Sequence, residues 1–184
     1  SMRNDNDNPD DIVYRLSRSD ERALNQFMAR WSQRLYHYAM SMLGSRDNVD
    51  EVVSDVFLQV WKSRRELVKI QYMEQWLRRI TYCKCMSRLR SDAGIPPFVS
   101  IDDIEHFTLP SIESTDETIL NREQQRAVSD GLESLPPRCR HVFYLAKIEK
   151  MPYKQIASIL DISLSTVNYH VAYAMEQLRN KLKR

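Results

Sequence analysis

Five polar side chains stand close together near the C-terminus, and their chemistry suits the reading of DNA bases. Ser165, Thr166, Asn168, Tyr169 and His170 supply hydrogen-bond donors, acceptors and an aromatic ring. At the N-terminal end of a recognition helix, such groups contact base edges in the major groove, where Asn can pair bidentately with adenine. The alternative is an ordinary helical hairpin whose polar residues face water.

The surrounding segment has the pattern of a helix-turn-helix, MPYKQIASILDISLSTVNYHVAYAMEQLRNKL over residues 151–182. Pro152 suits the first position of the short helix, where its missing N–H costs nothing. Ile156 and Leu160 give that helix one apolar face. Ser163 is placed to cap the second helix. The second helix has an apolar stripe formed by Val167, Val171, Ala174, Leu178 and Leu182.

The composition is that of an ordinary soluble protein. The 184 residues are 42% hydrophobic and 28% charged, and only three are glycine, which favours long helices. No apolar run approaches the length of about 20 residues that a transmembrane helix needs. The polar, acidic N-terminus does not resemble a secretory signal. We therefore expect a cytoplasmic protein without membrane insertion.

The three cysteines do not predict a metal site. Cys83 and Cys85 are two positions apart on an expected helix, so they point to nearly opposite faces and cannot easily hold one ion together. The pair Cys139 and His141 has the same difficulty. We expect no metal and no cofactor.

Charge and proline divide the chain into three parts. Residues 93–117 contain six acidic residues and no Lys or Arg, and they include Pro96, Pro97 and Pro110. Proline restricts its neighbours and removes backbone donors, so we expect an extended linker here. The linker separates two mildly basic domains, residues 10–92 and residues 118–184.

Both domains are predicted to be all-α, because no strand-like alternation is long enough to build a sheet. In the first domain, Ser19-Asp20 can cap the second helix and Asp47 the third, and Gly44 ends the second. The predicted core of the fourth helix is Met73, Trp76, Leu77 and Ile80. The expected helices cover residues 10–17, 20–43, 47–63, 71–91, 117–134 and 138–147, followed by the helix-turn-helix.

Two helices of the first domain carry opposite charge. Glu51 and Asp55 are spaced i, i+4 on the third helix, where like charges repel unless a basic partner relieves them. On the fourth helix, Lys84 and Arg88 share a face, as expected for contacts to phosphates. The alternative for each is a solvated helix face.

Three motifs, in this order, resemble bacterial sigma factors of the extracytoplasmic-function type in the sigma-70 family. NVDEVVSDVFLQVWKSR at residues 48–64 is similar to the family's acidic helix with a V-F-L-x-V-W core. QWLRRITYCKCMSRLR at residues 75–90 is similar to the adjoining W-L-x-x-I…L-R helix. Residues 135–179 resemble the pattern L-P-x-x-x-R-x-V-F-x-L…Y-x-x-I-A-x-x-L-x-I-S-x-x-T-V. The match covers about residues 10–92 and 118–184.

The resemblance implies a factor without catalytic activity that brings RNA polymerase to specific promoters. The first domain would bind core RNA polymerase and help to melt the −10 element, and the second would bind the −35 element. The acidic linker would thread the polymerase channel that later carries RNA. Promoter DNA and an anti-sigma factor are the other expected partners.

The resemblance also assigns residues to these roles. Polymerase binding is expected of Asp50, Glu51, Asp55 and Gln59. Binding of the −10 element is expected of Arg64, Arg65, Lys69, Tyr72, Arg79, Lys84 and Arg88. Binding of the −35 element is expected of Arg138 and Lys154 on the DNA backbone, and of Ser165, Thr166, Asn168, Tyr169 and His170 on the bases.

The chain departs from the family at several of these positions. Cys83 and Ser87 stand where the family often has Asn and Asp, and Asn168, His170 and Tyr173 stand where it often has Lys or Arg. A less basic recognition helix predicts weaker attraction to phosphates, so discrimination would rest more on Asn168 and Thr166.

Two other classes of protein could carry a helix-turn-helix. A plain transcriptional regulator would need a ligand pocket, a phosphoacceptor fold or a dimerisation helix in residues 1–92, and the sequence there indicates none of these. A recombinase would need a nucleophile beside general acids or arginines, and no such arrangement is evident.

Overall fold

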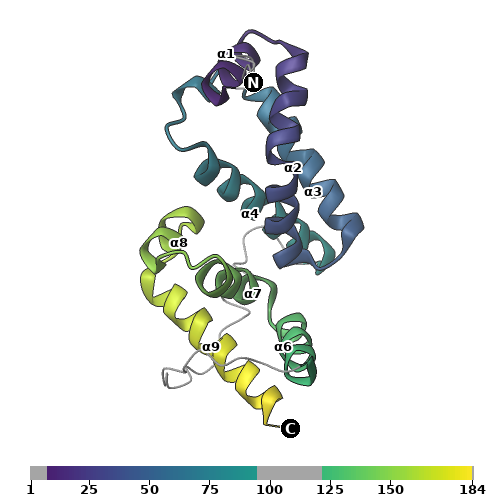
Figure 1. Ribbon diagram of the computed structural model, residues 1–184, viewed down its shortest axis with the longest axis vertical. Coiled ribbons are helices and arrows are strands. Elements are labelled where there is room, and N and C mark those ends of the chain that lie inside the picture. The colour runs from purple at the N-terminus through teal and green to yellow at the C-terminus, as the bar shows by residue number, and fades with distance from the viewer. Residues whose placement is uncertain (1–7, 95–121, 184) are drawn as a thin grey trace. The chain divides into compact units, whose positions relative to one another are not determined.

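The computed structural model describes residues 8–94 and 122–183, and all regular secondary structure within them is helical. The chain divides into two compact units, Ser1–Asp92 and Ala93–Arg184 (Figure 1). This confirms the predicted all-α class with a C-terminal helix-turn-helix. The acidic linker, from residue 95 onward, lies outside the described residues.

The helices of the first unit are α1 (Pro9–Ser17), α2 (Glu21–Leu43), α3 (Arg46–Lys62), the 3-10 turn η2 (Leu67–Lys69) and α4 (Met73–Asp92). Those of the second unit are α6 (Arg122–Ser134), α7 (Pro137–Phe143), the π-helical turn η3 (Tyr144–Ile148), α8 (Tyr153–Leu160) and α9 (Leu164–Leu182).

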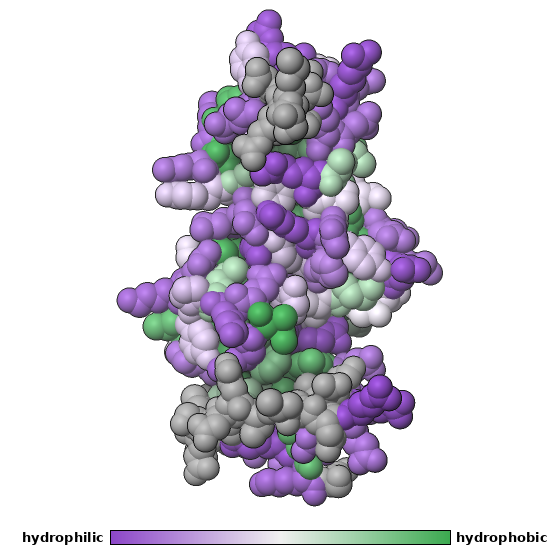
Figure 2. All heavy atoms as spheres, in the orientation of Figure 1, coloured by the Kyte–Doolittle hydropathy of each residue, from purple (hydrophilic) through white to green (hydrophobic). Residues whose placement is uncertain are grey.

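The first unit buries the apolar faces of α2, α3 and α4 against one another. Phe27 of α2 is 1% exposed, and its ring centroid lies 6.3 Å from that of Phe57 in an edge-on arrangement. The Trp31 ring lies at the same centroid distance from Phe27. Leu77 brings α4 into this core. Hydrophilic side chains cover most of the described surface on the face drawn in Figure 2.

The ends of α2 follow from the sequence as predicted. Asp20 is the N-cap, and its side chain accepts a hydrogen bond from the Arg22 N–H. Gly44 ends the helix in the left-handed region at φ 67°, which glycine adopts without steric cost.

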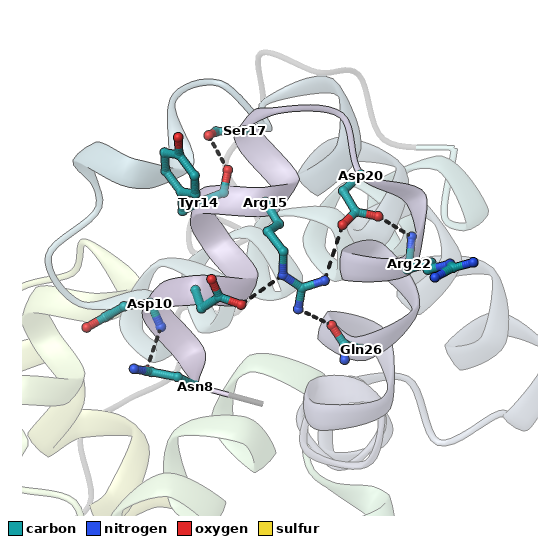
Figure 3. Close-up of polar contacts among 9 residues, drawn as sticks. Asn8, Asp10, Tyr14, Arg15, Ser17, Asp20, Arg22 and Gln26 are labelled. Atoms are coloured by element: carbon teal, nitrogen blue, oxygen red, sulfur yellow. Dashed lines mark hydrogen bonds and ion pairs between the residues drawn. The ribbon is translucent and has the colours of Figure 1, made fainter. Parts of the chain in front are cut away.

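Arg15 ties α1 to the start of α2 (Figure 3). Its Nε donates to the Asp11 carboxylate over 2.8 Å, and its NH1 donates to Asp20 over 3.2 Å. Its NH2 donates to the Gln26 side chain. These acceptors come from both helices, so one guanidinium fixes the α1–α2 corner.

The start of α3 differs from the prediction. Ser45 is the N-cap, without a side-chain hydrogen bond, and Asp47 lies exposed within the first turn instead of capping it. Asp47 still favours the helix from there, because a negative charge near the N-terminus interacts well with the backbone dipole.

The predicted core face of α4 was wrong except for Leu77. Met73, Trp76 and Ile80 are partly exposed, whereas the buried face continues through Thr81 and Cys85. The Thr81 hydroxyl donates to the Leu77 carbonyl oxygen, so its polar group is satisfied within the helix. The face of α4 that packs into the core is therefore not the most apolar face that the sequence indicates.

Arg78 also lies on the buried side of α4. Its guanidinium carbon lies 3.9 Å from the centroid of the Tyr38 ring, and its NH2 lies 3.2 Å from Glu74 Oε1. The Tyr38 hydroxyl donates to the same Glu74 oxygen over 2.9 Å. This cation–π contact and shared acceptor allow a charged residue to lie 9% exposed between α2 and α4.

The core of the second unit joins α6, α7 and α9. A Cβ on Gly131 of α6 would lie only 2.7 Å from a methyl group of Leu178, so glycine permits the close approach of α6 to α9. The buried cluster of this unit consists of Leu135, Cys139, Phe143, Ala174 and Leu178.

The helix-turn-helix has the predicted turn but begins differently. Pro152 is the N-cap of α8 and not its first helical residue. Asp161 turns the chain at φ 55°, and the Ser163 hydroxyl accepts a hydrogen bond from the Thr166 N–H, which confirms the predicted cap of α9. The helix expected over residues 138–147 is also divided, because η3 follows α7 directly.

Candidate nucleic-acid interface

The N-terminal turns of α9 present most of the predicted base-reading residues to solvent. Ser165 and Asn168 are exposed, and Thr166 and Tyr169 are partly exposed. The hydroxyl of Ser163 lies 3.0 Å from that of Ser165 and 2.8 Å from that of Thr166, so the cap also orders the first turn. Lys154 of α8 is exposed as well.

Asn168 and Tyr169 each make a side-chain contact within α9 that the sequence does not indicate. The Asn168 side-chain Nδ2 donates to the Leu164 carbonyl oxygen over 3.0 Å. The Tyr169 ring stacks on Tyr173, with centroids 6.3 Å apart and planes 14° from parallel. Tyr173 is partly buried and packs against the core of this unit, so it supports the Tyr169 ring from the side of the core.

His170 and Arg138 do not belong to the exposed face. His170 is 3% exposed, so its predicted exposure was wrong, and Arg138, expected to contact the DNA backbone, is only 6% exposed. Burial first and the nearby positive charge of Arg138 second lower the pKa of His170 to about 4. His170 is therefore neutral at physiological pH, and its side chain contributes to packing between α9 and α7 rather than to a DNA surface.

A groove of about 630 Å³ runs between α3 and α4 in the first unit. Its basic residues are Arg79 and Lys84, two of the predicted DNA contacts, and Trp76 supplies an aromatic side chain. Sequence analysis assigned Trp76 to the core, whereas α4 directs it to this groove. The complete lining is Gln59, Ser63, Trp76, Arg79, Ile80, Cys83, Lys84 and Ser87.

Cys83 and Ser87, two positions at which the chain departs from the family pattern, line the same groove. Both are exposed. Neither offers the amide group of Asn or the strong acceptor oxygens of the Asp carboxylate that the family often has here. Cys85, by contrast, is buried, and burial raises the pKa of its thiol to about 12. The predicted opposite orientation of the two thiols is confirmed.

The loop between α3 and α4 holds the other predicted −10 residues. Arg64 is engaged within the unit: its Nε donates to the Ser19 hydroxyl over 2.8 Å, and its guanidinium lies 4.5 Å from the Trp61 ring centroid. Arg65 and Tyr72 are exposed, whereas Lys69 is exposed but paired with Glu66 at 2.8 Å.

This loop also closes a second hollow, of about 320 Å³, against α1 and α2. Leu67 is completely buried beneath it, while Val68 is 54% exposed at its rim. Phe27 and Trp31 form part of its wall. The loop is thus anchored by one apolar side chain and leaves its neighbours accessible.

The acidic residues of α3 lie on its outer side. Asp50, Glu51 and Asp55 are exposed, and Gln59 is partly exposed at the groove. Glu51 accepts a hydrogen bond from Arg88 of α4, which raises the pKa of Arg88. The structure therefore brings together a predicted polymerase contact and a predicted DNA contact.

Two other observations concern the described residues as a whole. Among them, no group of three or more His, Cys, Asp or Glu side chains is placed to hold a metal ion. None of the helices in residues 8–94 and 122–183 is long and apolar enough to cross a membrane.

Solved structures with this fold include two complexes. The structure of CnrH in complex with the cytosolic domain of CnrY has a TM-score of 0.59 at 21% identity, covering 95% of this chain and 96% of CnrH. The sigma factor RpoE in complex with the anti-sigma factor NepR from Bartonella quintana has a TM-score of 0.59 at 19% identity, covering 86% and 96% of the two chains. At these identities the likeness concerns the fold.

Sequence comparison identifies the family. The ECF RNA polymerase sigma-E factor of Haemophilus influenzae is 24% identical over 178 residues, which are 94% of each chain. The factor of the same name from Escherichia coli K12 is 25% identical over 94% of this chain and 93% of its own. The family model for sigma-70 region 2 matches residues 27–94, and that for sigma-70 region 4 matches residues 125–178. Because these matches together span most of both units, the chain belongs to the sigma-70 family, as an extracytoplasmic-function sigma factor that directs RNA polymerase to promoters to initiate transcription.

Proposed function

We propose that the two units of this sigma factor contact two separate promoter elements while the first unit holds core RNA polymerase. The observation that carries this proposal is the presence in one chain of two different DNA-type surfaces. One is a groove with basic and aromatic side chains on α4, and the other is a helix-turn-helix. The protein acts as a regulatory subunit in the cytoplasm and catalyses no reaction itself.

The second unit binds the −35 element as duplex DNA. Ser165, Thr166, Asn168 and Tyr169 meet base edges, and Lys154 contacts the backbone. The exposed part of α9 before Arg179 contains no Lys or Arg. Phosphate attraction therefore contributes little here, and this unit selects the site more than it supplies affinity.

The first unit binds the −10 element as an unpaired strand. Arg79, Lys84 and Arg88 are suited to phosphates, and Trp76 offers a face on which a base can stack. Arg65, Lys69 and Tyr72 extend the contact onto the loop. A stacking site beside cations stabilises extruded bases, which is what melting requires.

Polymerase and an anti-sigma factor are the protein partners of this proposal. The acidic face of α3, with Asp50, Glu51, Asp55 and Gln59, is complementary to a basic surface on core polymerase. The acidic linker occupies a basic channel of the enzyme. Both structural neighbours were solved as complexes, one of them with an anti-sigma factor, which supports a similar partner for this chain.

Run-off transcription tests this function. Core polymerase from the host and the full-length chain are incubated together with a library of promoter fragments. We expect transcripts only when both proteins are present, and only from fragments that share an upstream and a downstream element. A chain that neither binds the core enzyme nor changes its choice of fragment is no sigma factor for that polymerase.

Asn168→Ala is expected to relax selection at the −35 element. The loss of one base contact costs about 1–3 kcal/mol of discrimination. Competition binding of holoenzyme to matched and mismatched −35 fragments measures this change. Asn180→Ala, at an exposed position near the end of the same helix, is the matched control and should leave selection unchanged. Equal selection by both variants would show that Asn168 does not read a base.

Replacing both Glu51 and Asp55 by Ala is expected to weaken binding to core polymerase by about 30-fold or more, since interface side chains that matter cost more than about 1 kcal/mol each and two such losses total about 2 kcal/mol. Both residues are exposed on α3, so the helix content should not change. Titration of labelled core enzyme measures the affinity, and circular dichroism checks the fold. Unchanged affinity in a folded variant would remove this face of α3 from the interface.

A further inference from the structure

One guanidinium group joins the two faces that the proposed function gives to different partners. Arg88 of α4 belongs to the surface proposed for DNA, and Glu51 of α3 belongs to the surface proposed for polymerase. In the free chain, Arg88 NH1 hydrogen-bonds to Glu51 Oε2, although 37 residues separate them in the sequence. The same N–H of Arg88 cannot donate to Glu51 and to a DNA phosphate at the same time.

A second nitrogen of Arg88 also donates a hydrogen bond within the unit, and its Nε is at ion-pair distance from a carboxylate without a hydrogen bond. Its NH2 donates to Asn48 Oδ1 over 2.9 Å, and its Nε lies 3.4 Å from Asp92 Oδ1. Glu51 and Asp92 together outweigh the single positive charge of Arg88. The guanidinium is therefore both directed and neutralised by its own unit, whereas Lys84, one turn earlier, lines the open groove.

We propose that the Arg88–Glu51 ion pair is an autoinhibitory contact that polymerase releases. In the free chain, Glu51 keeps Arg88 from DNA phosphates. When basic groups of core polymerase take up Glu51, Arg88 becomes available to the promoter strand. This inference rests on the proposed function, because it needs both partners.

The coupling follows from competition for one carboxylate. If polymerase and Arg88 compete for Glu51, and phosphate and Glu51 compete for Arg88, each partner binds more tightly when the other is present. Thermodynamic linkage makes this effect reciprocal. Free sigma factor thereby has less affinity for DNA than holoenzyme, without any change of fold.

The expected size is modest, because water screens the pair. The Glu51 side chain is 58% exposed and that of Arg88 is 34% exposed. Exposed ion pairs of this kind shift an equilibrium by about two- to fivefold. The ion pair therefore favours binding of polymerase before DNA, and it does not prevent DNA binding by the free chain.

The test compares DNA binding by the full-length free chain and two charge-matched variants. Glu51→Gln removes the ion pair, and Asp47→Asn removes the same charge one turn earlier on α3, at an exposed position. The probe is a fluorescein-labelled single-stranded oligothymidylate, followed by anisotropy at several salt concentrations. We expect E51Q to bind about two- to fivefold more tightly than D47N. Its salt slope should steepen by up to about 0.7, the value for one further phosphate contact with a single strand.

A third variant assigns the effect to Arg88. In an Arg88→Gln background, Glu51→Gln should change binding no more than Asp47→Asn does. E51Q binding equal to D47N binding, or a gain that persists without Arg88, would overturn the inference. The proposed function fails on different evidence, namely a wild-type holoenzyme that does not transcribe, whatever these variants do.

Discussion

Phe27→Ala is expected to lower the free energy of unfolding of the first unit by about 3–5 kcal/mol, the usual cost of truncating a buried aromatic side chain. Phe27 is 1% exposed and contacts both Trp31 and Phe57, so its removal leaves a cavity between α2 and α3. A loss of this size is a large fraction of a domain's stability. Promoter opening should fall with it, because α3 and α4 would no longer be held together.

Tryptophan fluorescence measures this unit separately. All three tryptophans, Trp31, Trp61 and Trp76, lie in the first unit, so urea unfolding followed by their emission does not report on the second. Leu58→Ala is the matched control, because Leu58 is 51% exposed on α3. The control should be nearly neutral. A Phe27→Ala cost below about 1 kcal/mol would contradict the packing described for this core.

Acidification is expected to destabilise the second unit through His170. Its folded pKa is about 4, below the ordinary value of 6.5, so below pH 6.5 the unfolded chain binds a proton that the folded chain does not. Stability from this group is therefore complete above about pH 6.5 and falls by up to about 1.4 kcal/mol per pH unit as the pH decreases. The loss levels off below the folded pKa, after about 3 kcal/mol in total.

His170→Gln isolates this effect from the protonation of carboxylates. Glutamine does not titrate, so the difference in unfolding free energy between the wild type and the variant should shrink from pH 7 to pH 4. A urea titration followed by NMR signals of α9 amides provides the measurement. A difference that is independent of pH would contradict the burial of a neutral imidazole between α9 and α7.

Local signals in the sequence predicted several helix ends, although not the starts of α3 and α8. Asp20 and Ser163 cap the helices that follow them, and Gly44 ends α2, because each of these features depends on neighbouring residues only. The apolar stripe of α9 through Val167, Val171 and Leu178 is likewise buried. These local features are sufficient to predict the all-α fold class and the position of the helix-turn-helix.

Contacts between distant helices could not be read from the pattern. His170 looks exposed because it follows polar residues, yet α7 covers it. Arg78 is a charged residue on α4, and its burial depends on Tyr38 and Glu74, which the local sequence does not indicate. The Arg88–Glu51 pair depends on how α4 lies against α3, which no local spacing specifies.

Permanganate reactivity of thymines in the −10 element tests most directly whether this chain directs promoter opening. A promoter fragment obtained from the transcription library is treated with core polymerase alone, with the full-length chain alone and with both together. If this chain directs promoter opening, thymines in the downstream element become reactive only when both proteins are present. Reactivity equal to that with core polymerase alone, while the chain is bound to the enzyme, would contradict that role.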